Sequence, residues 1–247
     1  MFKNLARGLA TVAFAASLCA ANSPAFAQAS RASLPDAGAK PASPAKPLKP
    51  PLKVAFVYVS PIGDAGWTYQ HDLGRLAMQA ALGDKVSTTF IESVDEGADS
   101  ERVIRDLAAQ GNQLVFATSF GYLEPTLRVA PSFPGTVFEH AGGYKTAANV
   151  GTYNARYYEG RYLAGMVAGK ASRAGVAGYV AGFPVPEVVQ GINAFALGMR
   201  SVNPKAQVKV LWLNTWFDPA RERDAAVSLV NQGADVLTNH SGSPAVA

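Results

Sequence analysis

A tryptophan lies between the first apolar run of the chain and a helix-like stretch. Residues 59–70 read Val-Ser-Pro-Ile-Gly-Asp-Ala-Gly-Trp-Thr-Tyr-Gln and include Asp64, Trp67 and Thr68. A loop at the carboxyl end of a first parallel strand is where open α/β folds bind ligands. The flat indole of Trp67 predicts a stacking surface, and a lid packed on its own lobe is the alternative. Asp64 either accepts a hydrogen bond from a ligand or caps the helix that begins near Thr68.

Further polar and aromatic residues follow the later candidate strands. Backbone N–H groups at a helix start can meet a polar ligand, and aromatic rings can close over a flat one. Ordinary packing is the alternative for the aromatic residues, and plain turn chemistry is the alternative for the last polar loop. The predicted binding residues of these segments are Ser119, Phe120, Gly121, Phe183, Trp216, Asn239, His240, Ser241 and Gly242.

Patterns for catalysis or metal binding are weak. The histidines are His71, His140 and His240, and their spacing places no pair on one helix face. The single cysteine lies near the N-terminus, and the sequence has no nucleophile elbow, P-loop or dinucleotide-binding glycine pattern. We predict no catalytic residue, no metal and no cofactor. An exported α/β enzyme is the alternative function, because Glu139 next to His140 could perform acid–base chemistry.

The elements that must position these residues alternate between strand and helix from Leu52 onward. The predicted strands are Lys53–Val59, Val86–Ile91, Leu114–Ala117, Thr136–Glu139, Asn149–Tyr153, Ala174–Ala181, Gln207–Leu213 and Ala234–Thr238. The predicted helices are Thr68–Leu82, Ala98–Gln110, Tyr122–Ala130, Arg156–Ala171, Val185–Val202 and Pro219–Gln232. Several strands are near-continuous β-branched runs, as in strands buried on both faces, so the alternation predicts an α/β fold with parallel sheets.

Two similar sequence segments indicate two similar lobes. Residues 106–119 and 228–241 each contain a helix end, a Gln-Gly stop, a strand and a polar loop. We therefore predict a first lobe over residues 52–153 and a second lobe over residues 154–247, with a cleft between them. The change of lobe is expected near Asn154, where the last strand of the first lobe ends and a long helix begins.

The N-terminal residues predict export. Lys3 and Arg7, an apolar stretch over residues 9–21 and an Ala-Phe-Ala sequence form a secretory signal with cleavage after Ala27. Residues 28–51 are rich in Ala, Pro, Ser and Lys, lack aromatic residues and predict a disordered tether. A retained anchor is disfavoured because the apolar stretch is short, and a lipid on Cys19 is disfavoured because a leucine precedes it.

The formal net charge of +4 owes much to lysines of the signal and tether. No basic stripe or arginine cluster follows Leu52, so we predict no nucleic-acid partner.

The segment around Asp64 and Trp67 resembles the Asp-Lys-Ser-Phe-Asn-Gln loop of the basic membrane protein family, the purine-nucleoside-type substrate-binding proteins of ABC importers. The resemblance extends from Leu52 to the end of the chain. It rests also on Tyr158-Glu-Gly-Arg-Tyr-Leu-Ala-Gly165, Gly182-Phe-Pro-Val-Pro186 with Gly198 and Val202-Asn-Pro204, and Phe217-Asp-Pro-Ala220 with Asn231-Gln-Gly-Ala-Asp-Val236. The resemblance implies a type I periplasmic binding fold, with two Rossmann-like lobes joined by a hinge.

The family resemblance also implies a function. The expected protein is a periplasmic monomer that holds a purine base or nucleoside between its lobes and delivers it to a permease in the inner membrane. Trp67 keeps the stacking surface of the family, worth about 1–3 kcal/mol per base, whereas Thr68 replaces an asparagine and loses one amide group. The residues 243–247 read as the opening of a helix where family members continue, so the second lobe is expected to be incomplete.

Overall fold

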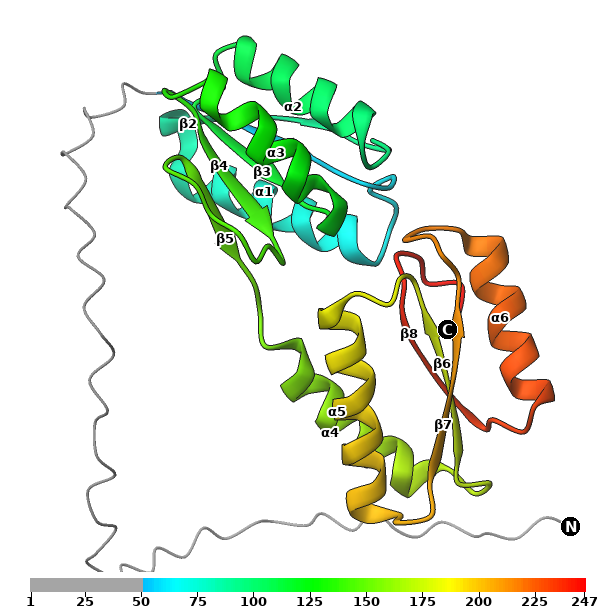
Figure 1. Ribbon diagram of the computed structural model, residues 1–247. Helices are drawn as coiled ribbons and strands as arrows, with labels where there is room; N and C mark the ends of the chain where they lie inside the picture. The colour runs from blue at the N-terminus through cyan, green and yellow to red at the C-terminus, as the bar shows by residue number, and fades with distance from the viewer. Residues whose placement is uncertain (1–50) are drawn as a thin grey trace, which may run out of the picture. The chain divides into compact units, whose positions relative to one another are not determined.

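The computed structural model of the chain describes residues 51–247, so the predicted signal segment and all but the last residue of the predicted tether lie outside it. The described residues form two parallel sheets. The first has the order β2-β1-β3-β4-β5 (Figure 1). Its strands are β1 (Leu52–Val57), β2 (Val86–Ile91), β3 (Leu114–Ala117), β4 (Val137–Ala141) and β5 (Val150–Tyr153).

Helices cover both faces of the first sheet. On one face, Val57 and Val115 pack in a core with Ile104. On the other face, Phe56 packs with Met78. Side chains alternate between the faces of a strand, so both sides of β1 are apolar and both are buried. The helices are α1 (Trp67–Leu82) on the Met78 side, and α2 (Ala98–Ala109) and α3 (Leu123–Val129) on the opposite side.

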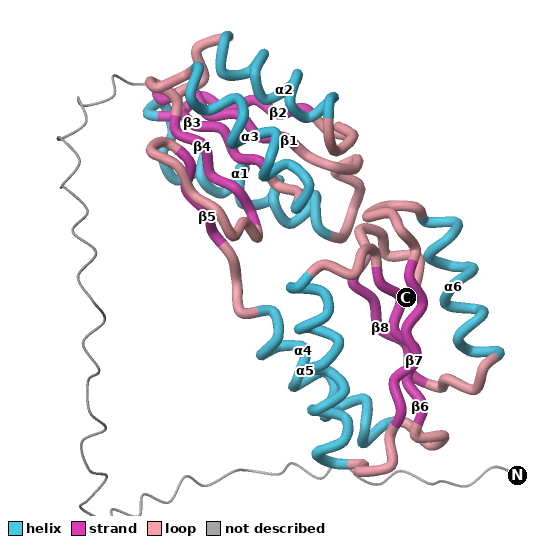
Figure 2. Tube along the Cα trace, in the orientation of Figure 1, coloured by secondary structure: helices cyan, strands magenta, loops and turns pink. Residues whose placement is uncertain are grey.

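The second sheet has the order β7-β6-β8, and helices again lie on both of its faces (Figure 2). Tyr179 packs with Phe195 on one face, while Val180 packs with Leu229 on the other. The strands are β6 (Val176–Ala181), β7 (Gln207–Trp212) and β8 (Val236–His240). The helices are α4 (Tyr157–Ala171) and α5 (Pro186–Val202) on the Phe195 side and α6 (Pro219–Asn231) on the Leu229 side.

Glycines allow α4 and α5 to pack at very short range. A Cβ atom added to Gly198 would lie 1.9 Å from the carbonyl oxygen of Tyr162, and one added to Gly165 would lie 2.1 Å from that of Phe195. Only glycine fits such backbone contacts. The two helices therefore form a closely packed pair. This pair carries four of the residues that line the cavity described below, Tyr157, Arg161, Glu187 and Val188.

The predicted α/β fold with parallel sheets is confirmed, and the predicted strands and helices are all present with small shifts at their ends. One shift matters for the site. The predicted polar loop at residues 239–242 is wrong in its first half, because β8 continues through Asn239 and His240. The ladder with β6 persists there, since Gly182 N–H donates to the carbonyl oxygen of His240 at 3.0 Å.

The predicted change of lobe near Asn154 falls between β5, which ends at Tyr153, and α4, which begins at Tyr157. The lobe limits themselves stay a prediction. Within residues 51–247, none of the helices combines the length and the apolar character needed to cross a bilayer.

Candidate functional site

A cavity of about 430 Å³ lies beyond the carboxyl ends of strands from both sheets. Ligand pockets typically measure roughly 300–1,000 Å³ and occur where strand ends of α/β folds converge. Aromatic rings contribute a large part of its wall. Its lining residues are Val59, Ser60, Gly66, Trp67, Gln70, His71, Ser119, Phe120, Ala141, Gly142, Tyr157, Arg161, Val185, Glu187, Val188, Trp216, His240, Ser241 and Gly242.

Trp67 is the first residue of α1, and its ring forms part of the wall. The indole Nε1–H donates to the carbonyl oxygen of Thr118 at 2.6 Å, so the nitrogen is already satisfied within the first sheet. The ring is tilted against that of His71, with 4.6 Å between centroids, and lies 6.1 Å from the ring of Tyr157. Trp67 therefore has no free hydrogen-bond donor.

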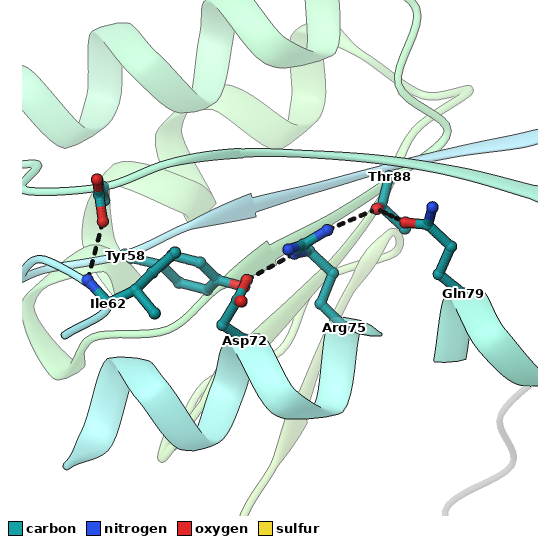
Figure 3. Close-up of polar contacts among 7 residues, drawn as sticks. Tyr58, Ile62, Asp72, Arg75, Gln79 and Thr88 are labelled. Carbon is teal, nitrogen blue, oxygen red and sulfur yellow. Dashed lines mark hydrogen bonds and ion pairs between the residues drawn. The ribbon is translucent and has the colours of Figure 1, made fainter. Parts of the chain in front are cut away.

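A polar network fixes α1 against the first sheet (Figure 3). Asp72 accepts from the Tyr58 hydroxyl at 3.2 Å and from Arg75 Nε at 2.6 Å. Arg75 also donates to Thr88 of β2 at 3.1 Å. Burial, reinforced by the Asp72 charge, raises the pKa of Tyr58 above its usual range, so the hydroxyl stays a donor. The network orients the helix whose first residue is Trp67.

Glu96 links Trp216, another aromatic residue of the cavity wall, to the loop after β3. Its Oε1 accepts from Ser119 Oγ at 2.7 Å, from the Gly121 N–H at 2.8 Å and from Trp216 Nε1 at 2.9 Å. Glu96 precedes α2 in the first sheet, whereas Trp216 follows β7 in the second. A single carboxylate oxygen thus joins the two halves of the cavity wall.

A buried carboxylate also positions the loop after β8. Glu222 of α6 has no exposed surface. Its Oε2 accepts from Ser241 Oγ at 2.8 Å and from Ser243 Oγ at 2.7 Å, and its Oε1 accepts from the Asp218 N–H at 3.2 Å. These bonds compensate the cost of burying the carboxylate. They also hold Ser241 at the cavity wall.

Polar side chains of the second sheet and its helices meet on one side of the cavity. His240 Nε2 lies 4.0 Å from Glu187 Oε1, and Glu187 Oε2 accepts from Asn154 Nδ2 at 3.0 Å. Arg161 Nη1 donates to Thr238 Oγ1 at 3.4 Å. Burial, and then the Arg161 charge, lower the pKa of His240 to about 4, so its imidazole is neutral near pH 7.

The structure brings together part of the predicted site set. The predicted residues that line the cavity are Trp67, Ser119, Phe120, Trp216, His240, Ser241 and Gly242. Whether any of them binds a ligand stays a prediction. The predicted residues that do not line this cavity are Asp64, Thr68, Gly121, Phe183 and Asn239.

Each of those five has another place in the fold. Asp64 is exposed, and it is not the helix cap, because Gly66 occupies the N-cap without a side-chain bond. Thr68 is buried with its hydroxyl 2.7 Å from that of Ser60. Gly121 donates to Glu96, as described above. Phe183 lines a smaller neighbouring cavity, edge-on to Trp216 with centroids 4.9 Å apart, and Asn239 donates to Ser241 Oγ at 3.0 Å.

Several lining residues were missed because they lie on helices. Gln70 and His71 follow Trp67 by three and four positions, so they share its face of α1. Tyr157 and Arg161 are likewise four residues apart on α4. Glu187 lies in the first turn of α5. Helical spacing from Trp67 was a usable signal for the first pair.

The histidines show no metal or catalytic arrangement among residues 51–247, where no group of three His, Cys, Asp or Glu side chains could hold a metal ion. His140 is fully buried, and burial lowers its pKa to about 4. Neither of its ring nitrogens has a hydrogen-bond partner in the described part of the chain. The neighbouring Glu139 points to the opposite face of β4, where its carboxylate lies against Gly151. The two side chains do not form an acid–base pair.

Comparison with known proteins identifies the family to which the chain belongs. Residues 52–246 match the family model described as Bmp, ABC transporter substrate-binding protein PnrA-like. Over 194 residues the chain is 59% identical to a protein of Brucella abortus named as a purine-binding protein, covering 78% of this chain and 55% of that protein. It is 48% identical over 194 residues to a Haloferax volcanii protein provisionally named as an ABC transporter glucose-binding protein, covering 78% of this chain and 49% of that protein.

A solved structure shares the fold. An ABC transporter solute-binding protein from Aeropyrum pernix superposes with a TM-score of 0.70 at 23% identity, covering 78% of this chain and 55% of that chain. This chain therefore spans about half the length of the proteins that it resembles.

Proposed function

Because the chain belongs to the PnrA-like Bmp family of ABC transporter substrate-binding proteins, we propose that it captures a purine base or nucleoside and delivers it to a permease. The observation that carries the proposal is the cavity of about 430 Å³ with aromatic rings on its wall. A purine offers two flat faces, and base–aromatic stacking contributes about 1–3 kcal/mol per base. The similarity to a protein named for purine binding supports the same ligand class.

The cavity wall also suits a ligand with a polar edge. The wall includes the polar residues Arg161, Glu187 and His240 as well as the aromatic residues Trp67 and Phe120. Stacking gives affinity for any flat ring, whereas a few buried polar groups select the orientation of the bound molecule. A purine has both kinds of surface.

We propose that the two halves of the wall are the two lobes of a hinged binder, with the hinge near Asn154. Trp216 and Glu96 are bonded across the halves, and Glu187 accepts a bond from Asn154 at the proposed hinge. Cleft closure around a ligand would form such bonds, and opening would break them. The protein would act in the periplasm as a monomer, exported by the signal segment expected at residues 1–27.

Native mass spectrometry of the protein purified from the periplasm tests the proposal. A co-purified purine base or nucleoside would appear directly as a mass difference. Titration with adenine, hypoxanthine, guanosine and inosine, followed by tryptophan fluorescence, should give micromolar or tighter binding for at least one of them. Glucose is the control ligand because of the Haloferax relative. Binding of glucose without any purine response would overturn the purine assignment, and hydrolysis of a bound nucleoside would favour the exported enzyme.

A further inference from the structure

Arg161 on the cavity wall has fewer partners than its chemistry allows. A guanidinium carries five N–H donors, yet Arg161 makes one hydrogen bond, at 3.4 Å to Thr238 Oγ1. No carboxylate lies within ion-pair distance of it among residues 51–247. Its carbon Cζ lies 5.7 Å from the centre of the Tyr179 ring, within the range of a cation–π contact. Donors of Arg161 therefore remain for a molecule in the cavity.

Two more polar atoms with unmet hydrogen bonds lie beside Arg161. The Tyr179 hydroxyl and His240 Nδ1 are buried, and neither has a partner in the described part of the chain. They surround Gly191 of α5. From a Cβ atom built on that glycine, the distances are 3.6 Å to Arg161 Cγ, 3.7 Å to the Tyr179 hydroxyl and 4.0 Å to His240 Nδ1. Buried polar atoms without partners are costly. Arg161 and His240 line the cavity and Tyr179 lies behind them, outside the lining, so Arg161 and His240 are the residues placed to meet a polar edge of a ligand.

Glu187 supplies hydrogen-bond acceptors on the same part of the wall. An ionised carboxylate only accepts hydrogen bonds. Asn154 donates to Glu187 Oε2 at 3.0 Å, whereas the nearest ring nitrogen to Oε1, His240 Nε2, lies 4.0 Å away, beyond hydrogen-bond distance. Because the pKa of His240 is lowered to about 4, its ring is neutral and does not form a permanent ion pair with Glu187. The wall thus combines free donors of Arg161 with a free acceptor of Glu187.

This combination matches one class of purine better than another. A 6-oxopurine presents two neighbouring acceptors, O6 and N7, and beside them the N1–H donor. Arginine binds O6 and N7 of such a base as a bidentate pair. A 6-aminopurine keeps N7 as an acceptor but carries an NH₂ donor in place of O6, so it cannot form the bidentate pair with Arg161. On the basis of the proposed purine function, we infer that Arg161 and Glu187 select 6-oxopurines, as bases or nucleosides, over 6-aminopurines.

Isothermal titration of the whole protein with hypoxanthine and with adenine tests the inference. Hypoxanthine should bind more tightly by about 5- to 150-fold, the discrimination typical of a bidentate contact. In Arg161→Met the apolar stem remains while the donors are lost, so the ratio of the two affinities should fall close to one. Arg161→Lys keeps the charge but not the planar fork, and it should also lower the ratio.

The control is Arg156→Met, immediately before α4. Arg156 is exposed, pairs with Glu159 at 3.3 Å and does not line the cavity, so this variant should keep the wild-type ratio. Thermal unfolding of each variant separates loss of selectivity from loss of fold. Equal or tighter adenine binding by the wild type would overturn the inference and leave the purine function standing, as would an unchanged ratio in folded Arg161→Met. No binding of any purine would overturn the proposed function and this inference together.

Discussion

Trp216 Nε1 donates to Glu96 Oε1 at 2.9 Å, and this bond links the loop after β7 to the loop before α2. The same oxygen accepts from Ser119 and from the Gly121 N–H. The carboxylate is therefore held in place by groups of the first sheet, and Trp216 is the donor that arrives from the second. Such an arrangement favours a closed cavity without requiring that Glu96 touch the ligand.

Removing this bond should weaken ligand binding modestly. Trp216→Phe keeps a ring at the wall and removes only the N–H donor. Because Glu96 is exposed, we expect purine affinity to fall by about 2- to 10-fold in Trp216→Phe and in Glu96→Gln. The double variant should lose little more than Trp216→Phe alone, because Glu96→Gln only weakens the bond that Trp216→Phe removes. Titration calorimetry of the wild type, the two single variants and the double variant completes this double-mutant cycle. Fully additive losses of binding free energy would show that the two residues act independently.

Trp67 should contribute through its face more than through its nitrogen. Trp67→Ala removes the stacking surface, so affinity for the purine should fall by about 1–3 kcal/mol. Trp67→Phe keeps a flat ring and loses the bond to Thr118, so it should retain more of the affinity. Loss of that bond should lower the free energy of unfolding by about 0.5–1.5 kcal/mol in both variants. A large fall in melting temperature with unaltered affinity would identify Trp67 as structural.

The sequence predicted the elements well because their signals are local. Residues 219–231 form α6 as expected, since Asp218 Oδ1 accepts from the Arg221 N–H at 3.0 Å and Pro219 occupies the first turn. Strand ends were less certain. Apolar character stops at Leu237, but the backbone ladder carries β8 through His240, and backbone bonds do not depend on side-chain polarity.

The site was only partly predictable. Residues after strand ends, such as Trp67 and Ser119, could be proposed because parallel strands end at one edge of a sheet. Arg161 and Glu187 could not be chosen from helical periodicity. On α4 the exposed positions include Leu163 and Val167, so apolar spacing does not separate the face against the sheet from the face toward solvent. Only the packing of α4 against α5 decides where Arg161 lies.

Acid should destabilise the fold through two histidines. Burial lowers the pKa of His140 and of His240 from the usual 6.5 to about 4, so the folded chain keeps both neutral. The unfolded chain binds protons below about pH 6.5, and the stabilisation present above that pH is lost as the pH falls toward 4. The loss is on the order of 3 kcal/mol for each histidine.

Urea unfolding at pH 7 and at pH 4.5 measures this effect. His140→Leu replaces a ring whose nitrogens lack partners in the described residues, so the variant should lose less stability between the two pH values than the wild type. The same pH dependence in the variant would show that His140 does not titrate on unfolding.

A close backbone approach at Gly66 should control how far the cavity can close. Gly66 has a φ of 95°, and a Cβ atom added there would lie 2.1 Å from the carbonyl oxygen of Gly242, and both residues line the cavity. Gly66→Ala should therefore hold the two loops apart and reduce purine affinity at least tenfold. Gly63→Ala is the matched control, because Gly63 also has a positive φ, of 60°, but an added Cβ meets nothing within 4 Å.

Both alanine variants place a side chain at positive φ in the same loop, at a cost of about 1–3 kcal/mol, and thermal unfolding measures that cost in each. Only Gly66→Ala should lose affinity, because only its methyl group collides with the second sheet's loop. Small-angle scattering with saturating ligand should show a more open form for Gly66→Ala than for Gly63→Ala. Equal affinities for the two variants would mean that the approach of Gly66 to Gly242 is not needed when the ligand is bound.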